Sequence, residues 1–270
     1  MAADKAFSGR KVFFLNPTPF LEENIVEQLR VMEYDAYSVH DYRIARNIAT
    51  VHSEGVWFVV LNEALTHTGW HNFIMTLETG DSLVPPIDVG IIMRGMTEES
   101  EKKFLGGLKC AGGVMKLKES ANVLLQTVKE TLDRLGAIGL RKNIRADCMA
   151  DKSAEIYWMK ESKMFRFKMI DISTAAIATT FPGTLQNEVF VNQVIPDAYI
   201  TMGKKQLGVP LKISTIKTAG DKLLVIFMYG DDVPPEAMMQ IREYIGTVLR
   251  TQLKDAIKNM PKDKLDYNNM

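Results

Sequence analysis

The chain has 270 residues, of which 46% are hydrophobic and 24% charged, and its formal net charge is zero. The length is enough for two ordinary domains, and the composition is that of a globular protein rather than a disordered or fibrous one. A zero net charge excludes a global electrostatic attraction to nucleic acid or to membranes. The sequence has no run of transmembrane length and no apolar signal segment, so we expect a cytoplasmic protein that binds no nucleic acid and inserts into no membrane.

Residues 11–136 alternate strand-like and helix-like patterns five times. Short apolar runs predict strands at residues 12–15, 36–39, 56–61, 89–93 and 114–117. Amphipathic segments between them predict helices, most clearly at residues 121–135, where we expect Ser120 to cap the start of the helix and Gly136 its end. The alternation predicts a doubly wound, parallel five-stranded sheet with helices on both faces.

This alternation resembles that of response-regulator receiver domains, but the chemistry of receivers is missing. Receivers have an acidic pair after the first strand, where this chain has Asn16 and Pro17, and a phosphoacceptor aspartate after the third, where it has Asn62 and Glu63. An amide cannot form an acyl phosphate. We therefore predict a pseudo-receiver domain at residues 1–138 that holds, dimerises or docks and is not an enzyme. An adaptor domain without any signalling role explains the pattern equally well.

Beyond a short linker at residues 137–141, apolar segments follow one another without intervening helices. They predict strands at residues 144–149, 154–159, 165–172, 177–180, 188–195, 199–202, 209–216 and 223–229. Turn signals such as Ala219-Gly220-Asp221 separate them, as in a small antiparallel barrel.

The end of the chain contains a proline pair and then a long amphipathic segment. Pro234-Pro235 predicts the start of a helix that runs from about residue 236 to residue 258, and its apolar positions would face the barrel or a partner. The tail, residues 261–270, is polar, and we expect it to be frayed. The two cysteines, Cys110 and Cys148, have no second thiol or histidine nearby in sequence. This favours buried, reduced thiols, and we expect no metal site and no cofactor.

Two short motifs in the second half carry recognisable chemistry. Arg141 and Arg145 are four residues apart, and Asp171-Ile172-Ser173 ends a later apolar segment. The arginine fork of donors matches phosphate oxygens and the O6/N7 edge of guanine. A carboxylate accepts from the N1 and N2 donors of guanine. Together these residues predict a site for a guanine dinucleotide.

The order and strand context of the motifs resemble the PilZ family, the bacterial receptors of cyclic di-GMP. The family pattern is Arg-x-x-x-Arg followed by Asp/Asn-x-Ser-x-x-Gly. The resemblance implies that Arg141 and Arg145 contact phosphate and guanine and that Asp171 and Ser173 read the base. Ala176 stands where the family has glycine.

The resemblance also implies a PilZ-like antiparallel β-barrel domain with a C-terminal helix at residues 139–270. The implied function is a non-catalytic cyclic di-GMP effector. Its ligand would reorder the linker at residues 137–145, which would change the interdomain arrangement or the surface offered to a protein partner. The alternative is a PilZ-like interaction module that no longer binds nucleotide. Ala176 favours that alternative, because a backbone there with positive φ would be strained by a Cβ by about 1 kcal/mol.

Overall fold

A computed structural model describes residues 9–80, 85–138, 143–258 and 260–270. The chain divides into two compact units. The first unit consists of Met1–Lys142 and Lys254–Met270, and the second of Asn143–Leu253.

The first unit is built on a five-stranded sheet in which every pairing is parallel, with the order β2-β1-β3-β4-β5. The strands are β1 (Val12–Leu15), β2 (Ala36–Val39), β3 (Val56–Val60), β4 (Asp88–Met93) and β5 (Val114–Lys116). The doubly wound parallel sheet predicted from the sequence is therefore confirmed, and each predicted strand begins or ends within one residue of the observed one.

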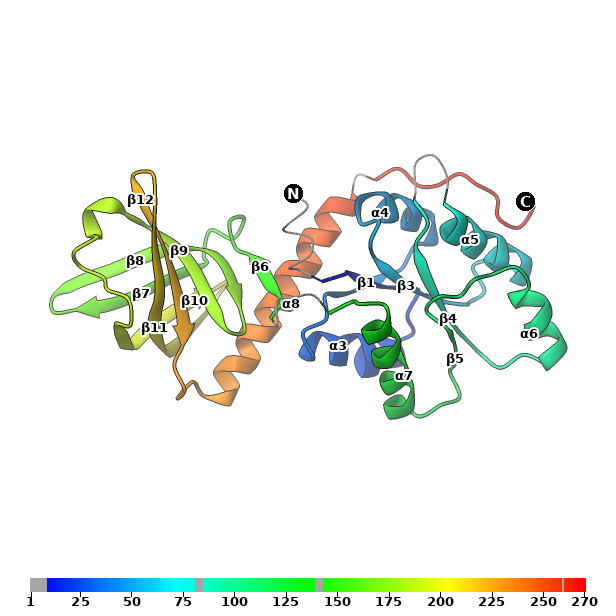
Figure 1. The fold of residues 1–270 in the computed structure, drawn as a ribbon, viewed down its shortest axis with the longest axis horizontal. Coiled ribbons are helices and arrows are strands. Elements are labelled where there is room, and N and C mark those ends of the chain that lie inside the picture. The colour runs from blue at the N-terminus through cyan, green and yellow to red at the C-terminus, as the bar shows by residue number, and fades with distance from the viewer. Residues whose placement is uncertain (1–8, 81–84, 139–142, 259) are drawn as a thin grey trace. The chain divides into compact units, whose positions relative to one another are not determined.

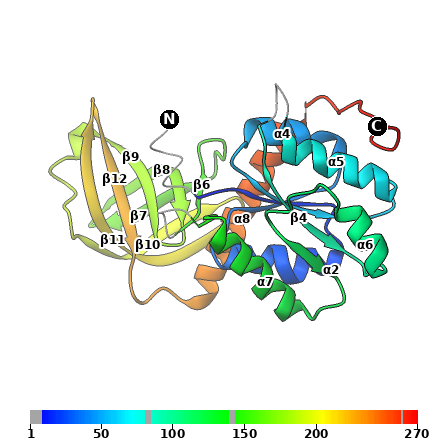
Figure 2. The ribbon, with the colours of Figure 1, turned by 45° about the vertical axis from the view of Figure 1, so that its right-hand side comes forward.

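Helices cover both faces of this sheet, as Figure 1 and Figure 2 show. One face carries α2 (Pro19–Leu21), a π-helical turn (Glu22–Val26), α3 (Glu27–Val31) and α7 (Ala121–Arg134). The other carries α4 (Ala45–Val51), after a short 3-10 turn (Tyr42–Ile44), and α5 (His67–Thr79), against which α6 (Glu98–Leu105) packs. The Ser120 hydroxyl accepts from the backbone N–H of Val123, and Gly136 has φ 65°, so both predicted caps of α7 are confirmed.

The strands are predominantly apolar because both faces of the sheet are buried. Val12 and Phe14 belong to the cluster on one face, which also contains Ile25 of the π-helical turn and Val128 of α7. Phe13 points to the other face and stacks on Trp57, with ring centroids 4.6 Å apart. The continuous apolar runs in the sequence thus correspond to strands that are covered from both sides.

The second unit is an antiparallel barrel (Figure 1). Its strand order is β6-β8-β7-β10-β11-β12-β9, and an additional β8–β9 pairing closes six of these strands into a barrel, with β6 added alongside β8. The strands are β6 (Arg145–Asp147), β7 (Glu155–Lys160), β8 (Lys163–Ser173), β9 (Ala176–Pro182), β10 (Val194–Met202), β11 (Lys205–Ala219) and β12 (Lys222–Tyr229). The predicted barrel is confirmed, and the turn at Gly220, with φ 63°, joins β11 to β12 as expected.

The barrel core contains Trp158, which stacks on Phe165 at 5.1 Å between ring centroids. Helix α8 (Pro235–Lys258) matches the predicted C-terminal helix, and Ile241 and Ile245 on it are buried in the barrel's hydrophobic cluster. The amphipathic pattern of this segment is therefore explained by packing on the barrel.

The strand predicted at residues 188–195 is wrong. A loop that follows a 3-10 turn (Gly183–Leu185) occupies residues 188–193, and β10 begins only at Val194. Val189 is 2% exposed, so it is an apolar residue that anchors a loop rather than part of a strand. Asn192 adopts φ 68°, and its N–H donates to the carbonyl of Ile213 at 2.7 Å. A left-handed residue in the middle of the run is incompatible with a continuous strand.

The frayed tail expected at residues 261–270 is also wrong. Tyr267 is 1% exposed and packs against Phe73 with ring centroids 5.2 Å apart. The Arg46 guanidinium lies 3.2 Å from the Asp263 carboxylate, and the N–H of Asp263 donates to the carbonyl of Arg43 at 2.7 Å. The tail is polar in composition, but one buried aromatic ring and these hydrogen bonds fix it within the first unit.

Both cysteines are free thiols. Cys148 is buried, as expected, and burial raises its pKa to about 12. Cys110 is only partly buried, and its burial together with the nearby Glu78 carboxylate raises its pKa to about 11. Within the described residues, no helix is both long enough and apolar enough to cross a membrane.

Candidate ligand site on the barrel

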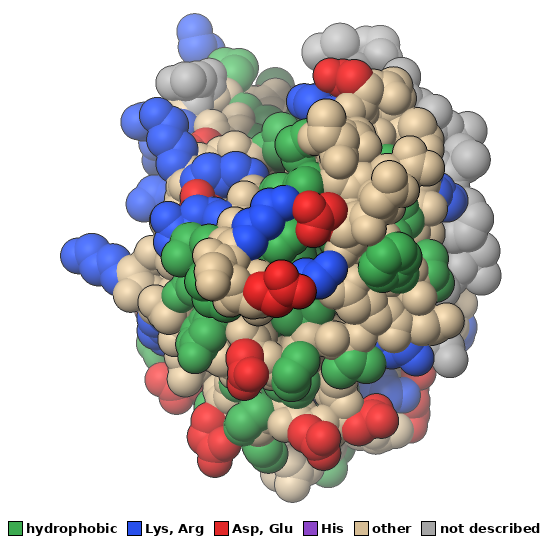
Figure 3. Space-filling model, turned by 90° about the vertical axis from the view of Figure 1, so that its left-hand side faces the viewer, with side chains coloured by type: hydrophobic (Ala, Val, Ile, Leu, Met, Phe, Trp, Pro, Cys, Tyr) green, Lys and Arg blue, Asp and Glu red, His purple; other side chains and the backbone are tan. Residues whose placement is uncertain are grey.

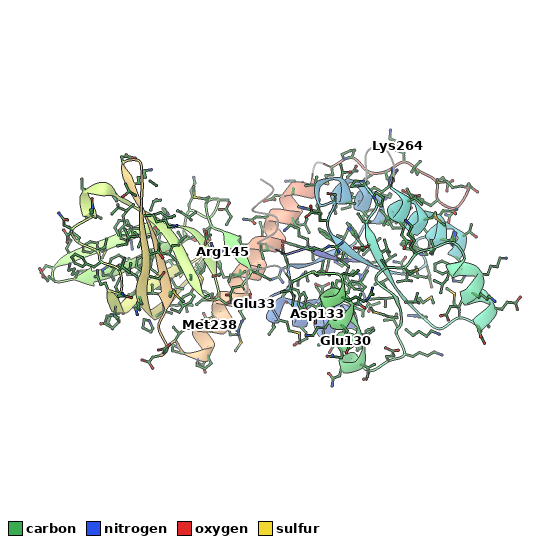
Figure 4. The ribbon with its side chains drawn as sticks, viewed as in Figure 1. Glu33, Glu130, Asp133, Arg145, Met238 and Lys264 are labelled. Atoms are coloured by element: carbon green, nitrogen blue, oxygen red, sulfur yellow. The ribbon has the colours of Figure 1, made fainter. Side chains whose placement is uncertain are left out.

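The pairing of β6 with β8 brings the two sequence motifs together. Arg145 lies directly opposite Ser173 in the antiparallel register, and Asp147 lies opposite Asp171. The Arg145 Nη1 atom is 3.9 Å from Oδ2 of Asp171, and the two side chains are 43% and 27% exposed. Figure 4 labels Arg145 on β6. A partly exposed pair at this distance contributes only about 0–1 kcal/mol, so a ligand can compete for the guanidinium at small cost.

Ser173 closes the tight turn between β8 and β9. Its hydroxyl accepts from the N–H groups of Ala175 at 3.3 Å and Ala176 at 3.0 Å, and it donates to the carbonyl of Ala176 at 3.2 Å. The residue is 3% exposed. Its hydroxyl is thus engaged within the turn, where it fixes the position of the strand end that carries Asp171.

Ala176 opens β9 and pairs with Met228 of β12. It is not among the described residues with positive φ, so its Cβ meets no left-handed strain. The condition under which Ala176 would argue against nucleotide binding is therefore not met.

Asn143 lies beside the candidate site, although the sequence analysis did not predict it there. Its Nδ2 donates to the hydroxyl of Thr174 at 2.8 Å, which ties the segment before β6 to the β8–β9 turn. The available signal was its place inside the Arg-x-x-x-Arg motif, between the two arginines. Arg141 itself lies outside the described residues, so its part in the site stays a prediction.

Helix α8 also contacts β6 and the loop that follows it. Gln252 donates from Nε2 to the carbonyl of Asp147 at 2.8 Å, and Tyr244 donates its hydroxyl to the Asp151 carboxylate at 2.8 Å. Strand β6 is therefore held both by its pairing with β8 and by α8 within the second unit.

Basic side chains gather on part of the barrel end that Figure 3 views. Exposed cations of β8 have carboxylate partners: Lys163 lies 2.6 Å from Glu188, and Lys168 lies 3.0 Å from Glu155. Arg166 is 3.6 Å from Glu155 as well. These pairs reduce the positive charge that the strand offers to an anion.

In the first unit, the structure places Asn16 and Asn62 directly after β1 and close after β3, where a receiver has its carboxylates. The side chain of Asn62 is exposed, and its Oδ1 accepts from the N–H of Ala64 at 3.0 Å. Among the described residues, no group of three or more His, Cys, Asp or Glu side chains is arranged to hold a metal ion.

We therefore expect the first unit not to accept a phosphoryl group. Incubation of the full chain with acetyl phosphate and magnesium should leave its intact mass unchanged, because an amide at position 62 cannot form an acyl phosphate. A receiver domain of known activity serves as the positive control. A stoichiometric, magnesium-dependent gain of about 80 Da that maps to the first unit would contradict this expectation.

The second unit is PilZ-like in architecture, with a closed six-stranded antiparallel barrel, an arginine-bearing entry strand and a following long helix. No family model matches the chain, and no curated protein matches its sequence.

Three solved structures show what the chain is similar to. YcgR from Escherichia coli in complex with c-di-GMP has a TM-score of 0.39 and 15% identity, over 46% of this chain and 53% of that one. The PilZ domain of YcgR with c-di-GMP has a TM-score of 0.37 and 12% identity, over 44% of this chain and 98% of that one. The MrkH–c-di-GMP complex from K. pneumonia has a TM-score of 0.36 and 10% identity, over 46% of this chain and 57% of that one. The chain thus spans about half the length of the longer of these proteins.

Proposed function

We propose that the chain is a cytoplasmic, non-catalytic receptor for cyclic di-GMP that holds its ligand at the β6–β8 edge of the barrel. The observation that carries this proposal is the register that sets Arg145 opposite Ser173 and its guanidinium 3.9 Å from the Asp171 carboxylate. One edge then offers a fork of donors for phosphate or guanine O6/N7 and an acceptor for guanine N1 and N2. Arg141, in the segment before β6, would add a second fork.

The position of the site suggests how binding would be transmitted. The second unit spans Asn143–Leu253, so the chain enters it two residues before Arg145 and leaves it one residue after Gln252. Gln252 donates to the carbonyl of Asp147 on β6. A ligand that binds at β6 therefore acts close to both covalent connections between the units. The output that we propose is a changed interdomain arrangement, or a changed surface for a protein partner.

An interaction module that binds no nucleotide is the second candidate. It is favoured by Ser173, whose hydroxyl both donates and accepts within the β8–β9 turn and has little remaining capacity to read a base. In that case Ser173 would serve only the turn, and the barrel would present its surface to a protein.

Isothermal titration calorimetry of the full chain with cyclic di-GMP distinguishes the two candidates. We expect a saturable binding event that weakens as salt is added, because two phosphate charges are being neutralised. GMP is the matched control. It has one guanine and one phosphate where cyclic di-GMP has two of each, and it should bind much more weakly. Absence of saturable heat with cyclic di-GMP would leave the interaction module as the better account.

A further inference from the structure

A cavity of about 940 Å³ lies in the first unit, at the carboxyl end of the parallel sheet. Residues that follow three of the strands line it: Asn16 after β1, Asn62 after β3 and Arg94 after β4. In open parallel sheets, ligands bind outside the carboxyl ends of the strands, where the strand order reverses. The order β2-β1-β3-β4-β5 reverses between β1 and β3, so the cavity lies at that position.

The polar part of the lining is rich in hydrogen-bond donors. It contains the Arg94 guanidinium, the imidazoles of His40 and His67, and the amide of Asn62, whereas Glu63 is its one carboxylate. Lys118 lies beside Gly95, which is a residue of the cavity lining. The Lys118 Nζ atom is 3.2 Å from the position that a Cβ on Gly95 would occupy, so its ammonium group is at the rim of the cavity. A surface with this balance of donors and acceptors fits an anion better than a cation.

Neither of these two cations is neutralised by a carboxylate within the described residues. In the part of the chain that the structure describes, neither Arg94 nor Lys118 takes part in an ion pair. By contrast, Lys116, on the neighbouring strand end, lies 2.9 Å from Glu101. The charges of Arg94 and Lys118 are therefore available to a ligand.

Asn16 adds an independent indication of a ligand. The residue lines the cavity with φ 53°, and its Nδ2 atom is buried without a hydrogen-bond partner in the described structure. Buried donors are almost always paired, so an unpaired donor in a cavity wall calls for an acceptor from outside the chain. The atom has almost no accessible surface, so a ligand oxygen would reach it only once the Asn16 amide turns toward the cavity.

The rest of the lining has hydroxyl groups, on Thr18, Thr97 and Ser100, and an apolar part that is formed by Val60, Leu61, Met93, Met96 and Leu117. A cavity of a few hundred to about 1,000 Å³, apolar with a few convergent polar groups, is typical of sites for small organic molecules. Inorganic phosphate alone would leave the apolar part of the cavity in contact with water.

We propose that this cavity binds a small organic phosphate of about mononucleotide size. Its phosphate would lie between Arg94 and Lys118, and its uncharged body would cover the apolar lining. Hydrogen-bond donors then occupy the positions after β1 and β3 where a receiver has carboxylates. The site would bind a phosphate ester instead of accepting a phosphoryl group. This site belongs to the first unit and does not depend on cyclic di-GMP binding at the barrel.

The test is calorimetry of the full chain with AMP, with adenosine and with inorganic phosphate as probes. We expect saturable binding of AMP, with adenosine and inorganic phosphate each at least about tenfold weaker, because each probe lacks one half of the recognised chemistry. Equal affinity for AMP and adenosine would show that Arg94 and Lys118 do not bind the phosphate group. Absence of AMP and phosphate binding at millimolar concentrations would overturn the proposal.

Variants locate the binding. Arg94→Ala and Lys118→Ala should each weaken AMP binding about tenfold, whereas Lys102→Ala, an exposed cation of α6 outside the cavity lining, should change it less than about twofold. Circular dichroism of each variant verifies folding, and Arg94→Gln gives a second variant, which is polar but uncharged. Arg145→Ala should retain AMP binding, which separates this site from that of the barrel. Unchanged AMP affinity in both Arg94 variants would contradict the assignment.

Discussion

Replacement of Arg145 by alanine should lower the affinity for cyclic di-GMP about ten- to a hundredfold. The guanidinium is the one arginine fork on β6, and its contact with the Asp171 carboxylate at 3.9 Å is loose enough to yield to a phosphate or a guanine edge. Loss of a charge-assisted hydrogen-bonding pair costs about 1.5–3 kcal/mol of binding free energy. The effect on folding should be small, because the side chain is 43% exposed and an exposed ion pair contributes about 0–1 kcal/mol.

Three further variants make the result specific. Arg166→Ala removes an exposed arginine of the same unit, 3.6 Å from Glu155, and should leave the affinity unchanged. Arg145→Lys keeps the charge but not the planar fork and should restore only part of the affinity. Asp171→Ala should also weaken binding, since it removes the carboxylate that would accept from N1 and N2 of guanine. If Arg145→Ala binds cyclic di-GMP as tightly as the parent does, β6 is not the ligand site.

The parallel sheet could be predicted from the sequence because its signal is local. Strand β1 (Val12–Leu15) is fully buried along its length, so four consecutive apolar residues mark it without ambiguity. Caps add local information: Ser120 and Gly136 fix the ends of α7 through bonds to residues within one or two turns. Wherever burial and hydrogen bonding are determined by neighbours in sequence, the pattern was sufficient.

The failures occur where distant residues decide the conformation. Residues 188–193 have a strand-like composition, yet the bond from Asn192 to the carbonyl of Ile213 on β11 holds them in a loop. The tail at residues 261–270 has a polar composition, yet α5 provides the aromatic surface that buries Tyr267. Neither partner can be identified from the local pattern.

The candidate site shows the same division. The motif residues Arg145 and Asp171 were found by residue type and order, but only the β6–β8 register shows that they lie side by side and that Ser173 is engaged in a turn. In the first unit, Asn16 and Asn62 indicated from sequence only that phosphoryl chemistry was lost. Their common cavity with Arg94 could not be foreseen, because it depends on how three strand ends converge.

Replacement of Tyr267 by alanine should lower the free energy of unfolding of the first unit by about 3–5 kcal/mol, which is the range for removing a large buried aromatic side chain. The ring is 1% exposed and meets Phe73 at 5.2 Å and Tyr42 at 6.3 Å, in edge-on geometry. Its backbone carbonyl also accepts from Nδ2 of Asn72 at 2.9 Å. A loss of this size is a large fraction of the stability of an ordinary domain.

Urea unfolding followed by the fluorescence of Trp57 and Trp70, both buried in the first unit, measures the change there. Trp70 lies 5.9 Å from Tyr42 and so reports on the region that Tyr267 contacts. A Trp158→Phe background removes the tryptophan of the second unit from the signal. Leu265→Ala is the matched control in the same tail: Leu265 is 42% exposed, so its loss should cost less than about 0.5 kcal/mol.

The phenol oxygen of Tyr267 makes a separate, pH-dependent contribution. Burial raises the pKa of Asp263, but hydrogen bonds from Tyr267, from the N–H of Leu265 and from Arg46 outweigh it, so the pKa ends below its ordinary value. A carboxyl with a lowered pKa stabilises the folded state above its unfolded pKa, and this stability is lost as the pH falls through the folded value. Tyr267→Phe should therefore cost about 1 kcal/mol at neutral pH and less in acid, whereas Tyr267→Ala should remain destabilising at every pH. If Tyr267→Ala unfolds at the same urea concentration as Leu265→Ala, the buried ring does not hold the tail to the first unit.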